Sequence, residues 1–368
     1  MQLSFLLAKT DLELSKEEVL AVVRHDSSWL HGNLLMMTPK DTENLVALQK
    51  RLAFTHSIHE FLFSCPQAEL VGKIKGFSWQ STYQEDFSLR VHQLTIRQKH
   101  QHNTQDANKD DYNNTNRTNT PQNSGFSEKN LSSIVWHALK DPIVKLRDAK
   151  TQIHAFLYGD YAVVAKQLTS DYQEFEKRRP HLRNFAHSGS MHPRLCRALV
   201  NLVGAKEREK ILDPCCGSGG LLIEAALMGL EAEGYDINRT MVWGTIRNMA
   251  QQKLSNYTVT CKDALSLQGK WDYVVTDLPY GLNSVAMSRE KRVSMKREVI
   301  SGKRELEEFY LAFFKKIKEI LEKRAVVVMP HYVEYRQMFA ETGLRIEKEF
   351  NQYVHKNLTR KIVVLEPR

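Results

Sequence analysis

Cysteines are scarce in this sequence, and their spacing excludes the usual structural roles of that residue. The 368 residues include five cysteines, an odd number, and no Cys-x-x-Cys pair occurs. Neither a disulfide framework nor a zinc clamp fits this pattern, so we expect no metal site and a reducing compartment. The adjacent Cys215 and Cys216 are interpreted as small packing residues in a tight turn.

Long apolar runs are also missing. No run approaches the length that spans a bilayer, and residues 1–18 turn acidic after a short apolar stretch without the basic start of a secretory signal. We therefore expect a cytoplasmic protein without a membrane partner. The net charge of +9 is compatible with a polyanionic partner but does not establish one.

The length and the 42% of hydrophobic residues indicate two or three domains with at least one sizeable core. Near the N-terminus, strands are expected at 1–10 and 33–37 and helices from Ser15 and over 42–53. The apolar face of the first helix is expected to include Leu20, Val23 and Trp29. This order indicates a small α+β unit.

The next part of the chain contains further strands and one segment of different composition. DFSLRVHQLTI alternates as a half-buried strand does, and two more strands are expected to join at Gly159-Asp160. Between them, residues 98–130 contain almost no aliphatic side chains. Such a segment cannot offset its ordering entropy, so we predict a disordered insertion.

A polar, basic connector follows at 169–190. Its cations have two readings, a solvated linker or phosphate contact, and the composition favours neither. The basic residues considered for phosphate contact are Lys177, Arg178, Arg179 and Arg183. After the connector, Pro193 is well placed in the first turn of a helix.

A glycine turn between a strand and a helix carries the first chemical signal. Ile211-Leu212-Asp213 ends a strand, and Cys216-Gly217-Ser218-Gly219-Gly220 precedes the apolar helix LLIEAALMG. Glycines at this place let the backbone approach a ligand closely. The G-x-G-x-x-G fingerprint of dinucleotide enzymes is absent, and Asp213 faces the place of a cofactor amino acid, so S-adenosylmethionine is favoured over a dinucleotide.

Two more carboxylates follow strands. Asp236 comes about 20 residues after the loop, where an acid can bind ribose hydroxyls, and Asp263 follows the strand 257–261 near the expected adenine edge. A lone aspartate is as well explained by a cap or a turn. Three aspartates at successive strand ends favour a shared cofactor site.

The strongest signal is Asp277-Leu278-Pro279-Tyr280, which ends the strand WDYVVTD. An exocyclic base amine is a poor nucleophile because its lone pair is delocalised into the ring. The Asp277 carboxylate and the Leu278 carbonyl can accept its two N–H groups and stabilise the positive charge that develops on the nitrogen. Pro279 fixes the backbone, and Tyr280 can stack on the base. A strand-ending turn without function is the alternative.

Together these motifs carry a resemblance. KILDPCCGSGG, GYDIN, KDA and TDLPYG resemble the class I S-adenosylmethionine-dependent amino-methyltransferases, and the chain outside residues 98–130 is similar to the THUMP-domain tRNA guanine-10 N2-methyltransferases. The resemblance implies an α/β fold with a Rossmann-like methyltransferase domain at 191–368. It also implies a ferredoxin-like α+β unit at 1–60, a THUMP RNA-binding domain at 61–168 and the basic linker 169–190.

The resemblance also assigns residues. The catalytic set is Asp277, Leu278, Pro279 and Tyr280. The cofactor set is Asp213, Cys216, Gly217, Ser218, Gly219, Asp236, Ile237, Asp263 and Ala264. The RNA-contacting set follows from charge and not from the resemblance. It is Lys177, Arg178, Arg179, Arg183 and Arg360, with a strand-flanking turn as the alternative for Arg360. Leu278 stands where the family usually has a proline, which leaves the orientation of its carbonyl open.

The implied function is methylation of the N2 amine of a tRNA guanine, guanine 10, to N2-methylguanosine or N2,N2-dimethylguanosine. The implied cofactor is S-adenosylmethionine, and the partner is tRNA, bound by a monomer with or without a small activating subunit. The alternatives are another tRNA guanine, ribosomal RNA, or a non-catalytic RNA-binding protein. A DNA adenine methyltransferase is disfavoured by the RNA-type N-terminal half.

Overall fold

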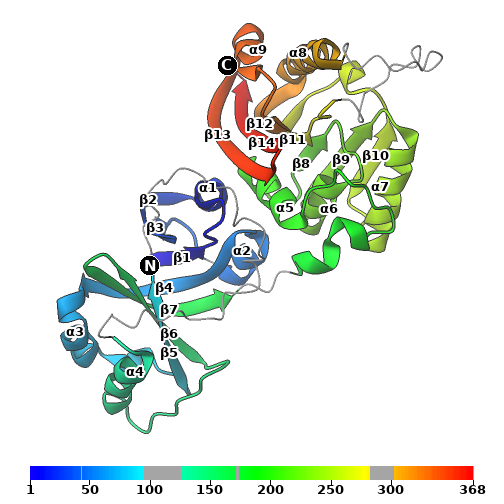
Figure 1. The fold of residues 1–368 in the computed structure, drawn as a ribbon. Coiled ribbons are helices and arrows are strands. Elements are labelled where there is room, and N and C mark those ends of the chain that lie inside the picture. The colour runs from blue at the N-terminus through cyan, green and yellow to red at the C-terminus, as the bar shows by residue number, and fades with distance from the viewer. Residues whose placement is uncertain (43, 95–125, 171–173, 282–301, 368) are drawn as a thin grey trace. The chain divides into compact units, whose positions relative to one another are not determined.

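The computed structural model describes residues 1–42, 44–94, 126–170, 174–281 and 302–367. Contacts divide the chain into two units, and each contains one seven-stranded sheet (Figure 1). Unit 1 comprises Met1–Leu12, Val23–Gln49 and Thr55–Asp171. Unit 2 comprises Glu13–Val22, Lys50–Phe54 and Tyr172–Arg368, so two short N-terminal segments belong to the C-terminal unit.

The sheet of unit 1 has the strand order β2-β3-β1-β4-β7-β6-β5. Its strands are β1 (Leu3–Leu7), β2 (His25–His31), β3 (Leu34–Pro39), β4 (Thr55–Pro66), β5 (Phe87–Gln93), β6 (Thr151–Tyr158) and β7 (Tyr161–Ser170). The helices of this part are α2 (Leu45–Arg51), α3 (Leu70–Gly76) and α4 (Glu128–His137). The long β4 pairs with β1 and with β7, and it contains the predicted domain boundary at residue 60.

Several local predictions for unit 1 are confirmed and two are wrong. The hairpin at Gly159-Asp160 is present as the β6–β7 pair. Val23 and Trp29 do not belong to the first helix, which ends at Val22. Gly32 turns β2 back onto β3, and Trp29 lies opposite Met36. Residues 128–130 of the predicted disordered insertion are helical, since Ser127 caps α4. Residues 98–125 of that insertion lie outside the described residues.

The sheet of unit 2 has the order β10-β9-β8-β11-β12-β14-β13. Its strands are β8 (Lys210–Asp213), β9 (Glu231–Asp236), β10 (Tyr257–Cys261), β11 (Trp271–Asp277), β12 (Leu321–Pro330), β13 (Leu344–His355) and β14 (Leu358–Pro367). The helices are α1 (Leu12–Val22), α5 (Pro193–Leu202), α6 (Gly220–Leu227), α7 (Arg239–Gln251), α8 (Gly302–Ile320) and α9 (Tyr335–Thr342).

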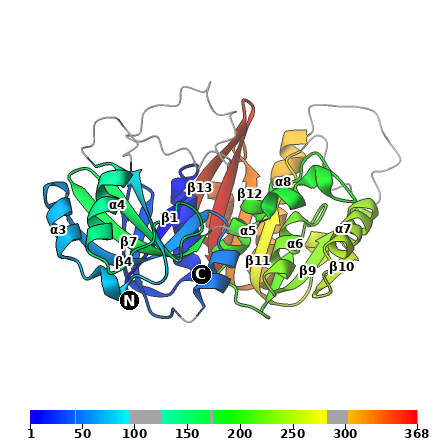
Figure 2. The ribbon, with the colours of Figure 1, turned by 90° about the horizontal axis from the view of Figure 1, so that it is seen from below.

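Parallel pairing joins β10 through β12, and β14 and β13 complete the sheet as an antiparallel pair. In Figure 2 this sheet is seen with β10 beside α7 at one end. The carboxyl ends of its central parallel strands meet at one edge, the place where open α/β sheets bind ligands.

Both faces of this sheet are buried, which positions its central strand ends firmly. On one face, Leu212, Val274 and Val327 share a core with Phe313 of α8 and Phe339 of α9. The alternate residues Ile211, Val275 and Val326 are 0–1% exposed as well. Because successive strand residues point to opposite faces, helices must cover both sides. The helices α5, α6 and α7 pack on the other face.

Among the described residues, no helix is both long enough and apolar enough to cross a membrane.

Candidate active site

The glycine loop after β8 has the geometry that the sequence predicted. Asp213 ends the strand and is 1% exposed. Gly217 and Gly219 have φ of 52° and 81°, in the left-handed region that favours glycine. A Cβ on Gly219 would lie 2.6 Å from the Thr245 Cγ2 atom. The loop is therefore packed tightly against α7, with its other side open to a cavity.

Asp236 at the end of β9 holds this loop. Its carboxylate accepts hydrogen bonds from the backbone N–H of Gly217 at 2.9 Å and of Asn238 at 2.8 Å. The Thr245 hydroxyl donates to the Gly217 carbonyl at 2.7 Å. Burial raises the pKa of Asp236 above its ordinary value, and the two N–H donors oppose that rise.

Asp263 follows β10 and caps a short 3-10 turn. Its side chain accepts from the Leu265 N–H at 2.9 Å, which is the capping role that the sequence left open. The neighbouring Ala264 is buried. Both residues nevertheless line the same cavity as Asp213 and Asp236.

That cavity has a volume of about 370 Å³, and most of the predicted catalytic and cofactor-binding residues line it. Twelve of the predicted residues line it, namely Asp213, Cys216, Gly217, Ser218, Asp236, Ile237, Asp263, Ala264, Asp277, Leu278, Pro279 and Tyr280. Gly219 shapes the loop from behind and is not part of the lining. The glycine loop and the Asp277 turn thus share one cavity, as parallel neighbouring strands require.

Hydroxyl groups hold the turn after β11. The Tyr280 hydroxyl donates to Asp277 Oδ1 at 2.6 Å. The Tyr310 hydroxyl of α8 donates to the Pro279 carbonyl at 3.0 Å, and the Tyr332 hydroxyl donates to the Tyr280 carbonyl. The carbonyls of Pro279 and Tyr280 are therefore occupied by side chains of the protein.

The Leu278 carbonyl is in a different position, because of a proline on the next strand. The Leu278 N–H donates to the Val328 carbonyl at 3.0 Å, which continues the parallel ladder between β11 and β12. The next step of that ladder would take the N–H of residue 330 to the Leu278 carbonyl. Residue 330 is a proline and has no N–H. The ladder therefore leaves the Leu278 carbonyl without its usual donor.

Burial raises the pKa values of both deep carboxylates of the cavity. The pKa of Asp213 rises to about 8, with the nearby Asp277 and Asp236 adding to the effect. The pKa of Asp277 rises to about 6, opposed by the charge of Arg360 and by the Tyr280 hydrogen bond. Two carboxylates at neighbouring strand ends thus differ in the pH at which they ionise.

The basic connector is partly folded into the protein. Arg178 donates to both oxygens of Glu224, at 2.8 and 3.1 Å, and Glu224 on α6 is 0% exposed. Arg183 is 7% exposed and donates to the Arg178 carbonyl. Lys177 and Arg179 lie nearer the surface and pair with glutamates of their own turn. None of the four lines the cavity.

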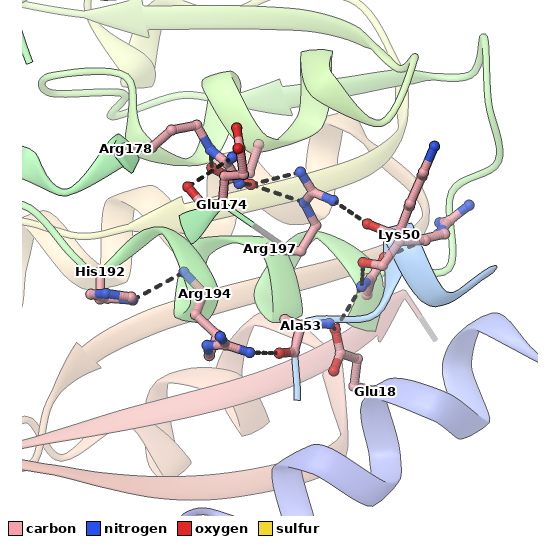
Figure 3. A network of polar contacts seen from close by, with 11 residues as sticks. Glu18, Lys50, Ala53, Glu174, Arg178, His192, Arg194 and Arg197 are labelled. Carbon is pink, nitrogen blue, oxygen red and sulfur yellow. Dashed lines mark hydrogen bonds and ion pairs between the residues drawn. The ribbon is translucent and has the colours of Figure 1, made fainter. Parts of the chain in front are cut away.

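The same ion-pair group reaches two N-terminal segments that belong to this unit. Arg197 of α5 also binds Glu224 and donates to the Lys50 carbonyl, and Arg194 donates to the Ala53 carbonyl (Figure 3). Glu18 of α1 accepts from the Ala53 N–H. Helix α6, which starts at the glycine loop, is therefore tied to α5 and to the segment 50–54.

Sequence reasoning missed part of the lining. His187, Ser190, Met191 and Cys196 line the cavity, and Ser190 shares a 2.7 Å hydroxyl contact with Ser218 of the glycine loop. The signal available was their position just before and within the helix that Pro193 opens. Tyr310 and Tyr332, which also hold the Asp277 turn, gave no signal, because they are 31 and 52 residues away from their partners Pro279 and Tyr280.

Comparisons with known proteins agree with this site. Residues 180–362 match a family model described as RMKL-like, methyltransferase domain. The tRNA (guanine(10)-N2)-dimethyltransferase of Methanothermobacter thermautotrophicus is 30% identical over 379 residues, which cover 100% of this chain and 99% of that protein. The protein of the same name from Methanocaldococcus jannaschii is 34% identical over 206 residues, 53% of this chain and 51% of that protein.

Among solved structures, TrmN from Thermus thermophilus resembles the chain with a TM-score of 0.51 and 16% identity, over 100% of this chain and 99% of that one. This likeness supports the Rossmann-like fold alone. The full-length match to the Methanothermobacter protein supports the narrower assignment. The chain belongs to the family of tRNA (guanine(10)-N2)-dimethyltransferases.

Proposed function

We propose that this protein methylates the exocyclic N2 amine of a guanine in tRNA, guanine 10, with S-adenosylmethionine as the methyl donor. The product is N2-methylguanosine or N2,N2-dimethylguanosine. The observation that carries the proposal is one cavity in which the glycine loop of β8 faces the Asp277 turn of β11. The names of full-length and half-length relatives support the substrate.

The residues present fit this cofactor. Gly217 places no side chain between its backbone and the cavity, and Asp213 is a buried carboxylate suited to an ammonium group. Asp236 and Asp263 line the cavity farther along the strand ends, where ribose hydroxyls and an adenine edge would lie. The bound cofactor supplies an electrophilic methyl group on a sulfonium. The protein supplies the binding, the orientation and a partly water-excluded site.

The Asp277 turn receives the amine. Asp277 Oδ1 is taken by Tyr280, so Oδ2 is the oxygen that can accept one N–H of the amine. The Leu278 carbonyl, left without a ladder donor by Pro330, accepts the other. Two such acceptors localise the nitrogen lone pair and stabilise the positive charge that forms on the nitrogen. Proton release follows to Asp277 or to solvent.

The remaining assignments belong to the same proposal. Residues 61–168 act as a THUMP domain that binds the tRNA, and the surface cations Lys177 and Arg179 contact its phosphates. The protein works in the cytoplasm as a monomer. A small activating subunit is the alternative for full activity, and adding purified candidate subunits to the assay separates the two.

The test is a methylation assay with labelled S-adenosylmethionine and unmodified tRNA, followed by nuclease digestion and identification of the nucleoside. We expect N2-methylguanosine or N2,N2-dimethylguanosine at position 10. Label in adenosine, or in ribosomal RNA and not in tRNA, would contradict the substrate assignment.

The matched variant for this assay is Asp277→Asn. The amide retains the shape of the carboxylate and loses its charge, so turnover should fall by about 10²–10³-fold while cofactor affinity stays within about twofold. Cofactor affinity is measured by titration calorimetry. Turnover near that of the unchanged protein would remove Asp277 from the chemistry.

A further inference from the structure

Arg360 lies behind the Asp277 turn, outside the lining of the cavity. It stands at the start of β14, opposite Pro330 on one side and Gln352 on the other. Its Nε donates to the Tyr280 hydroxyl at 3.0 Å, and its Nη1 donates to Gln352 Oε1 at 3.3 Å. The guanidinium therefore contacts the residue that contacts Asp277.

The chemistry of the three groups gives this chain of contacts a direction. A guanidinium can only donate hydrogen bonds, so Arg360 must occupy a lone pair of the Tyr280 oxygen. The single phenol proton of Tyr280 is then directed to its other neighbour, Asp277 Oδ1, at 2.6 Å. While Arg360 is in place, the Tyr280 hydroxyl cannot turn its proton toward Arg360, because the guanidinium nitrogen is itself a donor and cannot accept it.

From these contacts, and given the proposed function, we propose that Arg360 is a positioning residue for methyl transfer. It acts through Tyr280 and never touches the base or the cofactor. By fixing the Tyr280 hydroxyl as a donor to Oδ1, it fixes the rotation of the Asp277 carboxylate and leaves Oδ2 for the guanine amine. It also favours the ionised carboxylate, which alone accepts with both oxygens.

This role differs from an RNA contact, which is the other use of a cation at this position. An arginine that bound tRNA phosphate would change the affinity for tRNA and its salt dependence. An arginine that positions Asp277 changes turnover and the pH at which turnover begins. The charged and titratable groups around Asp277 are Arg360, Tyr280, Asp213, Cys196 and Tyr310. Of these, Arg360 and Tyr280 favour its anion.

The first experiment compares Arg360→Met with the unchanged protein in the tRNA methylation assay between pH 5 and 9. The pH profile of turnover for the unchanged protein should have an ascending limb with its midpoint near pH 6, where Asp277 ionises. In Arg360→Met the limb should move to higher pH, and turnover at pH 7 should fall by about tenfold. The KM for tRNA should change less than about twofold. Arg360→Lys, which retains a cationic donor, should restore the limb.

Three further variants make the result specific. Tyr280→Phe keeps the ring and removes the connecting hydroxyl, so it should shift the limb in the same direction. The double variant Arg360→Met, Tyr280→Phe should lose about as much turnover as the stronger of the two single variants, since both changes break the same chain of contacts. Lys361→Met is the matched control. It removes a positive charge from the next position of β14, where Lys361 pairs with Glu349, and should leave the limb in place.

A second measurement needs neither cofactor nor tRNA. The carboxyl resonances of ¹³C-labelled aspartate in the free protein identify Asp277 by the signal lost in Asp277→Asn, and its titration should move upward in Arg360→Met and in Tyr280→Phe. An unchanged titration in Tyr280→Phe, with the fold intact by circular dichroism, would overturn the proposal. So would an Arg360→Met protein that raises only the KM for tRNA. Absence of guanine methylation by the unchanged protein would instead refute the proposed function.

Discussion

At the residue scale, two aspartates with the same place in the fold have different environments. Asp213 and Asp277 end the neighbouring strands β8 and β11. Asp213 is 1% exposed and its only described backbone donor is the Cys215 N–H at 3.2 Å. Asp277 is half-buried and has Tyr280 and Arg360 behind it. The sequence identified both residues, but their ionisation depends on neighbours that it does not show.

The raised pKa of Asp213, about 8, predicts a pH-dependent cofactor affinity. Below pH 8 the free protein holds Asp213 protonated, because burial disfavours the anion. In the proposed cofactor site the ammonium group pairs with the Asp213 anion, so a proton must leave when the cofactor binds. Affinity should therefore rise about tenfold from pH 6 to pH 7. Calorimetry in buffers of different ionisation enthalpy measures both the affinity and the released proton.

Asp213→Asn supplies the control for this prediction. The amide cannot ionise, so its cofactor affinity should be lower and flat between pH 6 and pH 7. Equal pH dependence in the two proteins would show that the titrating group is not Asp213.

At the element scale, the sequence predicted the strands that matter for chemistry but not the contact between them that frees a carbonyl. The motif TDLPYG indicated that Leu278 follows a strand. Its odd feature, a leucine where the family has a proline, left the carbonyl's orientation open. The register of β11 against β12 answers this, because it places Pro330 where the next ladder donor would be. The strands β11 and β12 start 50 residues apart, and the motif TDLPYG alone does not specify their register.

Pro330→Ala tests this reading of the ladder. Alanine would add an N–H that can donate to the Leu278 carbonyl and compete with the guanine amine, so turnover should fall by about tenfold while cofactor affinity stays unchanged. The methylation assay and calorimetry measure the two effects. Val333→Ala, a cavity-forming change in the loop after β12, serves as a control for stability loss alone. Full turnover in Pro330→Ala would mean that another group occupies the carbonyl.

The β4, β5 and β6 strands of unit 1 carry a cluster of three histidines. His92 Nε2 and His154 Nδ1 are 2.8 Å apart, and the His59 ring lies 4.9 Å from that of His154. Burial lowers the pKa of His59 to about 3 and of His92 to about 4, and lowers that of His154 as well. These rings are therefore neutral in the folded protein at neutral pH.

Acid should destabilise this sheet. A histidine with a folded pKa below its unfolded value of about 6.5 contributes fully above pH 6.5, and its contribution is lost as the pH falls toward 4. At pH 5 the loss is about 2 kcal/mol of unfolding free energy for each fully buried ring. Hydrogen exchange of β4, β5 and β6 amides at pH 7 and pH 5 measures it. His59→Phe should reduce the pH dependence, and the exposed His137→Phe should not.

At the scale of the whole molecule, the two units defined by contacts are not continuous stretches of the sequence. The sequence predicts successive domains, with the methyltransferase domain beginning at residue 191. In the structure, Glu13–Val22 and Lys50–Phe54 belong to the catalytic unit. The partners that place them there, Glu18 and Asn201, are 183 residues apart. Motifs are local in the chain, so they predicted the glycine loop and the Asp277 turn but could not predict this contact.

Glu18 connects these segments to the catalytic unit. Its side chain is 0% exposed, and its two oxygens accept from the N–H groups of Ala53 and Phe54 and from the Asn201 amide, at 2.7, 2.9 and 2.7 Å. Three donors on two oxygens satisfy the carboxylate and keep segment 50–54 beside α5. Burial raises the pKa of Glu18, and those donors oppose the rise.

Glu18→Gln should therefore destabilise the catalytic unit itself. Glutamine has one acceptor oxygen, and its NH₂ group would face a backbone donor, so we expect a loss of about 2–4 kcal/mol of unfolding free energy. Glu13→Gln on the same helix, where the side chain is 74% exposed, is the matched control and should change stability by less than about 0.5 kcal/mol. Denaturant unfolding followed by cofactor binding measures the catalytic unit specifically.

A fragment of residues 174–368 should bind cofactor more weakly than the full chain, since it lacks every N-terminal partner of α5. Equal stability of that fragment and the full chain would show that the catalytic unit is complete without them.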